Sequence, residues 1–250
     1  MKNNPIMKIL IGLTVTLVLV SGVRLLILLQ EYAQAQGIYD QLSDTVVDDD
    51  SDNRESSMTT AAELGISVDF AALKKINLDI LGWLYIPDTN INYPITKSAD
   101  NRDYLKIAST GERSVAGSIF MDYRNTADFS DRNTIIYGHN MKNGSMFGTL
   151  DAYEDKKYWE DHPKIYIFTE TTTYVYEIYT AAEISANVDY YKVKLVDDQA
   201  YANYLTATVG NALYETGVIP TIEQKILTLS TCTTNHKNRF VIQGVLLEEG

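Results

Sequence analysis

The distribution of apolar residues divides the chain into a long apolar segment, a polar stretch and a region of short alternating runs. Residues 9–29 are apolar with Arg24 as their only charge, and about 20 such residues form a helix long enough to cross a membrane. Lys2 and Lys8 precede the segment, and acidic residues dominate the part of the chain after it. The positive-inside rule predicts a short cytoplasmic tail and a signal-anchor over residues 1–30, with the remainder of the chain extracellular.

The polar stretch after the apolar segment is predicted to be a stalk. Residues 30–42 contain enough Ala, Gln and Leu to continue the helix, whereas residues 44–57 are acidic and Ser-rich without apolar periodicity. Such a composition is typical of linkers that have no packed core. We therefore expect a linker over residues 31–60 and one folded domain over residues 61–250. A cleaved signal peptide is the alternative to the anchor, since small residues flank Ser21, although no clear cleavage site is present.

The remaining pattern predicts a mainly β domain with added helices. A short helix is expected at 69–76 behind a capping Asp69, another within 146–162, and a long one from 198 to about 216, where apolar residues recur at offsets of three and four. About eight strands predict a barrel or a sandwich. They are expected at residues 83–86, 91–95, 116–124 and 133–140, in a hairpin over 164–184, and at 225–232 and 239–249.

Charge narrows the possible partners. The net charge of −12 and the absence of clustered Lys and Arg exclude a nucleic-acid partner, because tracking a phosphate backbone requires a basic surface. The sequence contains no glycine-rich loop of the kind that binds phosphate groups, and we expect neither a cofactor nor a metal ion.

The single cysteine is the strongest candidate for chemistry. Cys232 has no partner for an internal disulfide, so in an exported chain it is buried and inert, paired with another molecule, or a working thiol. A working thiol needs a base. His139 follows a β-branched run and a glycine, where a strand would deliver it to a barrel rim; a purely structural histidine is the alternative. His162 is expected to be solvated at a helix end, and His236, four residues after the cysteine, is a competitor in a polar loop.

Arg239 is the candidate oxyanion donor. Two strand patterns are joined by residues 233–238, so antiparallel pairing would bring Arg239 close to Cys232. A guanidinium does not act as a base at neutral pH, but it donates hydrogen bonds to a developing oxyanion. The alternative is a solvated arginine on an edge strand.

Several of these segments together resemble the class B sortases, over roughly residue 61 to the C-terminus. The resemblance implies an eight-stranded sortase β-barrel with N-terminal helices and a long helix between strands 6 and 7. It also implies a cysteine transpeptidase held outside a Gram-positive cell. The segments that carry it are LGWLYIPDTNINYPI (81–95), AGSIFMDYRN (116–125), NTIIYGHNMKNGSMFGTL (133–150), TLSTC (228–232) and RFVIQG (239–244).

The resemblance also implies a role for individual residues. It places the nucleophile on Cys232, the catalytic histidine on His139 and the arginine on Arg239. The loop between Cys232 and Arg239 is short for the class and contains no carboxylate, so no third group that orients His139 is evident there. The substrate-groove positions that the resemblance implies are Asn101, Leu105, Ser230 and, with a loose alignment, Tyr190 or Tyr191.

The implied reaction is a transpeptidation without a cofactor. A sorting signal near the C-terminus of an exported protein is cleaved after its threonine, and the thioacyl intermediate passes to an amine, either a peptidoglycan cross-bridge or a pilin lysine. Two other classes remain open. A papain-like or cell-wall amidase peptidase usually places its nucleophile before its histidine, whereas His139 precedes Cys232 here. A surface ligand-binding barrel would bury the cysteine.

Overall fold

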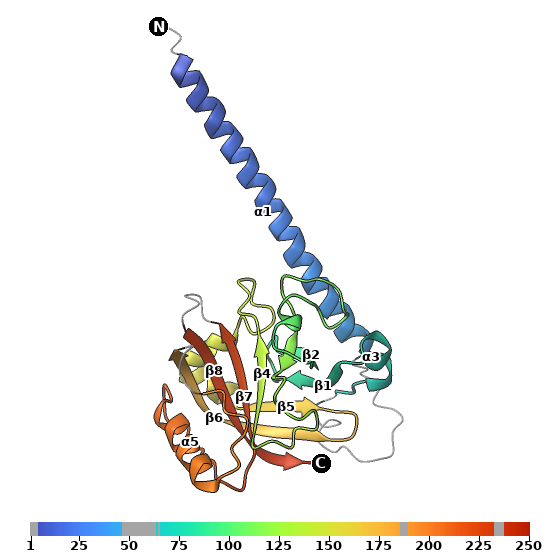
Figure 1. Ribbon diagram of the computed structural model, residues 1–250, viewed down its shortest axis with the longest axis vertical. Coiled ribbons are helices and arrows are strands. Elements are labelled where there is room, and N and C mark those ends of the chain that lie inside the picture. The colour runs from blue at the N-terminus through green and yellow to red at the C-terminus, as the bar shows by residue number, and fades with distance from the viewer. Residues whose placement is uncertain (1–4, 47–63, 65, 186–189, 233–237) are drawn as a thin grey trace.

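The computed structural model describes residues 5–46, 64, 66–185, 190–232 and 238–250, with the backbone alone at residues 44–46 and 232. A long helix projects from a β-barrel that carries short helices on its surface (Figure 1). The helices are α1 (Pro5–Val46), α3 (Phe70–Ile76), α4 (Lys156–Asp161) and α5 (Asp198–Gly210), with 3-10 helices η1 (Asp103–Leu105) and η2 (Leu150–Glu154). The strands are β1 (Ile80–Tyr85), β2 (Asn92–Thr96), β3 (Ile119–Met121), β4 (Asn133–Gly138), β5 (Lys164–Phe168), β6 (Thr173–Ser185), β7 (Ile226–Cys232) and β8 (Asn238–Glu249).

The strands close into a barrel in the order β1-β2-β3-β4-β7-β8-β6-β5. Strand β5 pairs with β1 and completes the ring, which decides for the predicted barrel and against a sandwich. Two of the pairings are parallel, β2 with β3 and β4 with β7, and the others are antiparallel. The predicted hairpins are confirmed as β5–β6 and β7–β8, and α5 lies between β6 and β7 in the chain.

Three predicted elements are shorter in the structure than the sequence suggested. Helix α5 ends at Gly210 rather than near residue 216 because the chain turns toward β6, where the Leu213 amide donates to the Ala181 carbonyl at 2.8 Å. The segment predicted as strand 116–124 contains only the three residues of β3, since Gly117 has a positive φ just before them. Within 146–162 only η2 and α4 are helical.

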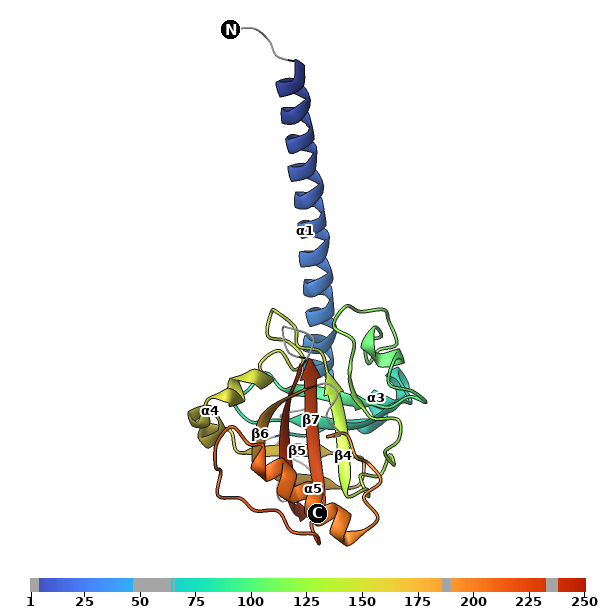
Figure 2. The same ribbon diagram turned by 60° about the vertical axis from the view of Figure 1, so that its left-hand side comes forward.

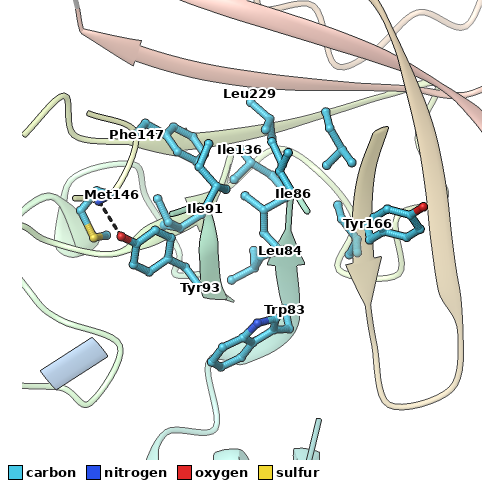
Figure 3. Close-up of a cluster of buried hydrophobic side chains, with 14 of the residues drawn as sticks. Trp83, Leu84, Ile86, Ile91, Tyr93, Ile136, Met146, Phe147, Tyr166 and Leu229 are labelled. Atoms are coloured by element: carbon cyan, nitrogen blue, oxygen red, sulfur yellow. Dashed lines mark hydrogen bonds between the residues drawn. The ribbon is translucent and has the colours of Figure 1, made fainter. Parts of the chain in front are cut away.

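Large apolar side chains fill the barrel (Figure 3). Leu84 from β1, Ile136 from β4 and Leu229 from β7 belong to this cluster, and all three are fully buried. Burying one such side chain stabilises the fold by about 1.5–3 kcal/mol. The buried Tyr93 hydroxyl accepts a 2.9 Å hydrogen bond from the Met146 amide, which ties the segment after β4 to this core.

Helix α1 has two parts with different surroundings. Within Pro5–Ser43 the most apolar stretch of 18 residues has a mean hydropathy of 2.3, so the helix is long and apolar enough to cross a membrane, a property that signal sequences share. Its last turns pack on the barrel, where Ala35, Tyr39 and Leu42 are buried. The Tyr39 hydroxyl donates to the Gly117 carbonyl, just before β3. The helix leaves the barrel at the end where β4 and β7 terminate (Figures 1 and 2).

Candidate active site

A pocket of about 200 Å³ lies at the barrel end where β4 and β7 terminate. Strand order makes β4, β7 and β8 neighbours. Gly138 is the last residue of β4 to pair with β7, opposite Thr231, so His139 and Cys232 each lie one residue beyond this pair. Cys232 in turn pairs with Arg239 across β7–β8. The residues that line the pocket are Asn101, Leu105, Phe120, Tyr137, Gly138, His139, Ser230, Thr231 and Arg239.

Gly138 allows β4 to deliver His139 to the pocket. A Cβ at this position would lie 2.5 Å from the Ile119 side chain and 2.7 Å from the ring of Phe147. No other residue type lacks this atom, so only glycine fits beneath the chain as it leaves the strand. The next backbone group is fixed as well, because the Phe147 amide donates to the His139 carbonyl at 3.0 Å.

A backbone carbonyl orients the His139 ring. His139 Nε2 lies 2.7 Å from the Leu105 carbonyl oxygen. A carbonyl oxygen only accepts hydrogen bonds, so Nε2 carries a proton and Nδ1 remains for proton exchange. The sequence suggested no side-chain partner for this histidine between Cys232 and Arg239, and the structure supplies a main-chain group instead.

Arg239 is half-buried at the start of β8. Its Nη1 donates to the Asn238 carbonyl at 3.2 Å, and among the described residues it forms no salt bridge. A guanidinium carries five N–H donors in a planar fork, so most of its donors remain for a ligand in the pocket. The predicted pairing across the hairpin with Cys232 is confirmed by the strand register.

The structure separates the predicted groove residues into two groups. Asn101, Leu105 and Ser230 line the pocket. Tyr191 lies beside it, with its hydroxyl 2.9 Å from Ser230 Oγ. Tyr190 points away from the pocket: it is 2% exposed, packs against buried side chains of β6 and β8, and donates its hydroxyl hydrogen to a carbonyl of α5 at 3.4 Å. The Tyr190 hydroxyl contacts α5 and the Tyr191 hydroxyl contacts β7, so only Tyr191 lies at the pocket.

One of the other two histidines belongs to the described residues, and it does not line the pocket. His162 caps the end of α4. It is half-buried rather than solvated as predicted, with Nδ1 3.1 Å from the Pro87 carbonyl oxygen and its ring against Tyr158. His236 lies outside the described residues.

Sequence reasoning missed the aromatic wall of the pocket and the carboxylate behind it. Phe120 and Tyr137 are cross-strand partners with ring centroids 5.4 Å apart. Behind them lies the buried Asp122. Burial opposes ionisation of this carboxyl, but hydrogen bonds from Arg124, Tyr137 and Asn101 outweigh it and lower its pKa. The one signal in the sequence was an acid within a β-rich run, followed two residues later by an arginine.

Known proteins are similar to this chain in sequence and in fold. The Sortase domain family matches residues 84–247. Sortase B of Listeria monocytogenes is 43% identical over 178 residues, which cover 70% of this chain and 72% of the relative. The structure of sortase B from B. anthracis in complex with AAEK1 superposes with a TM-score of 0.76 at 33% identity, covering 88% of this chain and 99% of that one. The structure of a sortase B complexed with triglycine superposes with a TM-score of 0.69 at 31% identity. The match covers 72% of this chain and 85% of that one.

The barrel and its single cysteine at the strand ends fit a cysteine transpeptidase. The chain belongs to the sortase family and, within it, to class B. Membership decides against the papain-like peptidase and the ligand-binding barrel that the sequence alone left open.

Proposed function

We propose that this class B sortase is a membrane-anchored enzyme that cleaves a C-terminal sorting motif after threonine and transfers the acyl group to an amine. The observation that carries the proposal is the convergence of three strand ends. The register of β4, β7 and β8 brings His139, Cys232 and Arg239 to one end of the barrel, and two of these residues line the pocket there.

In the first half-reaction the Cys232 thiolate attacks the carbonyl carbon of the threonine. The C–N bond then breaks, its electron pair leaves with the amine, and the amine takes a proton from the His139 imidazolium. The Leu105 carbonyl holds Nε2–H of that ring, so Nδ1 is the nitrogen that transfers the proton. The product is a thioacyl enzyme.

Arg239 stabilises the oxyanion that forms during the attack. Its guanidinium is half-buried and bordered by the pocket, where a charge-assisted hydrogen bond is stronger than in bulk water. Removing one preorganised oxyanion donor typically costs about 10²–10³ in rate. Asn101, Leu105, Ser230 and Tyr191 form the walls against which the extended sorting peptide lies.

The second half-reaction needs a primary amine. The amine attacks the thioester carbon, the Cys232 sulfur leaves as thiolate, and His139 accepts the proton that the amine loses. The acceptor is the amine of a peptidoglycan cross-bridge or of a pilin lysine. The complex of a related sortase B with triglycine supports an amine acceptor.

Helix α1 supports an anchor in the membrane, and the charge pattern around it supports a barrel on the outside. It leaves the barrel at the end that carries the pocket (Figures 1 and 2), so an anchored enzyme would turn its active site toward the membrane surface. A sorting signal that is followed by an apolar stretch would be held at that same surface. The short cytoplasmic tail and signal-anchor over residues 1–30, the linker over residues 31–60 and the extracellular catalytic domain from residue 61 stay predictions.

The proposal is tested with the full-length chain in detergent and a peptide library that has threonine fixed at the scissile position. We expect one sequence class to be cleaved after threonine, with transfer to triglycine or to a lysine side chain when either is added. His139→Ala should abolish both products, while His162→Ala, a matched change at a half-buried histidine away from the pocket, should keep most activity. Cleavage by the His139→Ala variant, or no cleavage by the wild type, would overturn the proposal.

A further inference from the structure

Asp122 is a buried carboxylate that accepts five hydrogen bonds behind the pocket. Its Oδ1 accepts from Arg124 N at 2.9 Å and Nε at 2.8 Å. Its Oδ2 accepts from Arg124 Nη2 at 2.7 Å, Tyr137 Oη at 2.9 Å and Asn101 Nδ2 at 3.0 Å. A buried charge is tolerated only when it is paired and hydrogen-bonded, and this one is satisfied on both oxygens.

Two of the donors line the pocket from different sides. Tyr137 belongs to β4, two residues before His139, whereas Asn101 lies four residues before Leu105, whose carbonyl holds the His139 ring. The Asn101 amide is also held from its other end, because its Oδ1 accepts from the Tyr123 amide at 2.9 Å. The carboxylate therefore joins the two walls and sets the direction in which each polar side chain points.

We propose that Asp122 is a positioning residue for the transpeptidation, which holds Asn101 and Tyr137 in the orientation that receives the sorting peptide. Asp122 is not among the residues that line the pocket, so it acts through these two. The inference rests on the proposed function, since it assumes that a peptide occupies the pocket.

Replacing the carboxylate by an amide would remove the charged acceptor that Asn101 and Tyr137 share. In Asp122→Asn an NH₂ group takes the place of one oxygen and faces N–H or O–H donors. If it replaces Oδ2, Asn101, Tyr137 and one arginine nitrogen lose their acceptor. If it replaces Oδ1, the two pocket residues keep only a neutral acceptor, which binds less strongly than a carboxylate. We therefore expect Asp122→Asn to loosen the hold on both pocket residues in either orientation.

The matched control is Asp131→Asn. Asp131 lies in the same connection between β3 and β4, and its Oδ2 accepts from Asn125 Nδ2 at 2.8 Å, Thr126 N at 2.7 Å and Thr126 Oγ1 at 3.0 Å. None of these partners lines the pocket. Each variant thus removes a carboxylate that accepts several hydrogen bonds in the connection between β3 and β4. Asp122→Asn does so behind the pocket, and Asp131→Asn does so away from it.

The experiment measures kcat, KM and Tm of the full-length variants on the peptide selected from the threonine library. Asp122→Asn should raise KM at least tenfold, while Asp131→Asn lowers Tm with kcat and KM unchanged. In a background that already carries Asn101→Ala and Tyr137→Phe, Asp122→Asn should add less than twofold, because the residues it positions are absent. Should Asp122→Asn fail to fold, Asp122→Asn/Arg124→Gln, which removes both charges of the ion pair, takes its place.

Two results would overturn the inference. One is a KM that Asp122→Asn leaves unchanged, and the other is a full, additive effect in the background that lacks both pocket side chains. Failure of the proposed function gives a different outcome, since in that case the wild type and the Asp131→Asn control would not turn over the peptide either.

Discussion

Gly117→Ala would disturb the carbonyl that orients His139. Gly117 has φ +57°, and a Cβ built there lies 2.5 Å from the Tyr104 carbonyl oxygen and 2.8 Å from that of Leu105. The Leu105 oxygen is the group that contacts His139 Nε2 at 2.7 Å. A single added methyl group therefore pushes directly on the backbone that holds the His139 ring.

The size of the effect follows from these distances. A left-handed backbone costs a non-glycine residue roughly 1–2 kcal/mol. The contact must also open from 2.5 Å to at least 3.0 Å, the shortest separation that a Cβ atom normally shows, and backbone atoms do not give way as a side-chain end does. Misplacing a catalytic group by about 1 Å can lower the rate about 10²-fold. We expect kcat/KM to fall between tenfold and a hundredfold.

Gly111→Ala is the control that separates the cost of a left-handed backbone from the effect of the added Cβ on the Leu105 carbonyl. Gly111 lies in the same connection between η1 and β3, has φ +89°, and would have no heavy atom within 4 Å of an added Cβ. Both variants should therefore lose about 1–2 kcal/mol of unfolding free energy from the left-handed backbone, while only Gly117→Ala loses activity. The assay is kcat/KM with a urea titration for each variant. Equal activities for the two variants would refute the reasoning.

Three further changes test other parts of the site. Arg239→Lys should lower kcat/KM by about 10²–10³, because one ammonium does not replace a planar fork of donors; near wild-type activity would reduce the arginine to a local charge. Tyr39→Phe should cost about 1–3 kcal/mol in a urea titration, because the Gly117 carbonyl loses its buried donor; unchanged stability would mean that α1 docks without this bond. Asp122 has a lowered pKa in the fold, so its stabilisation is present above the unfolded pKa of about 3.9 and is lost as pH falls through the folded value. Urea titrations at pH 7 and pH 3 should show a larger loss for wild type than for Asp122→Asn, and an equal loss would contradict the assignment.

Local features of the fold were predictable from the sequence, and its closure was not. The hairpins β5–β6 and β7–β8 join neighbouring segments, so alternation and turn residues were enough to predict them. The parallel β4–β7 pair joins residues 133–138 to 226–231, and no local pattern specifies such a distant partner. The strand pattern alone therefore left a barrel and a sandwich open, and the resemblance to class B sortases was what favoured the barrel.

The candidate site was also predictable only in part. Cys232 and Arg239 face each other across a short hairpin, which spacing alone predicted. The group that orients His139 is the carbonyl of Leu105. Every residue has a main-chain carbonyl, so the amino-acid sequence does not indicate which one contacts the ring. Tyr190 and Tyr191 lie in an irregular segment. Neither helical nor strand periodicity applies there, so the sequence did not predict which of the two side chains faces the pocket.

The central claim is that Cys232 carries the acyl group, and intact-mass spectrometry of the full-length enzyme tests it most directly. After incubation with the selected peptide and an acid quench, the wild type should gain the mass of the peptide fragment that ends in threonine. Hydroxylamine should remove this mass, and the Cys232→Ala variant should gain none. Peptide cleavage without an adduct on the wild type, or an adduct that persists in Cys232→Ala, would contradict the account.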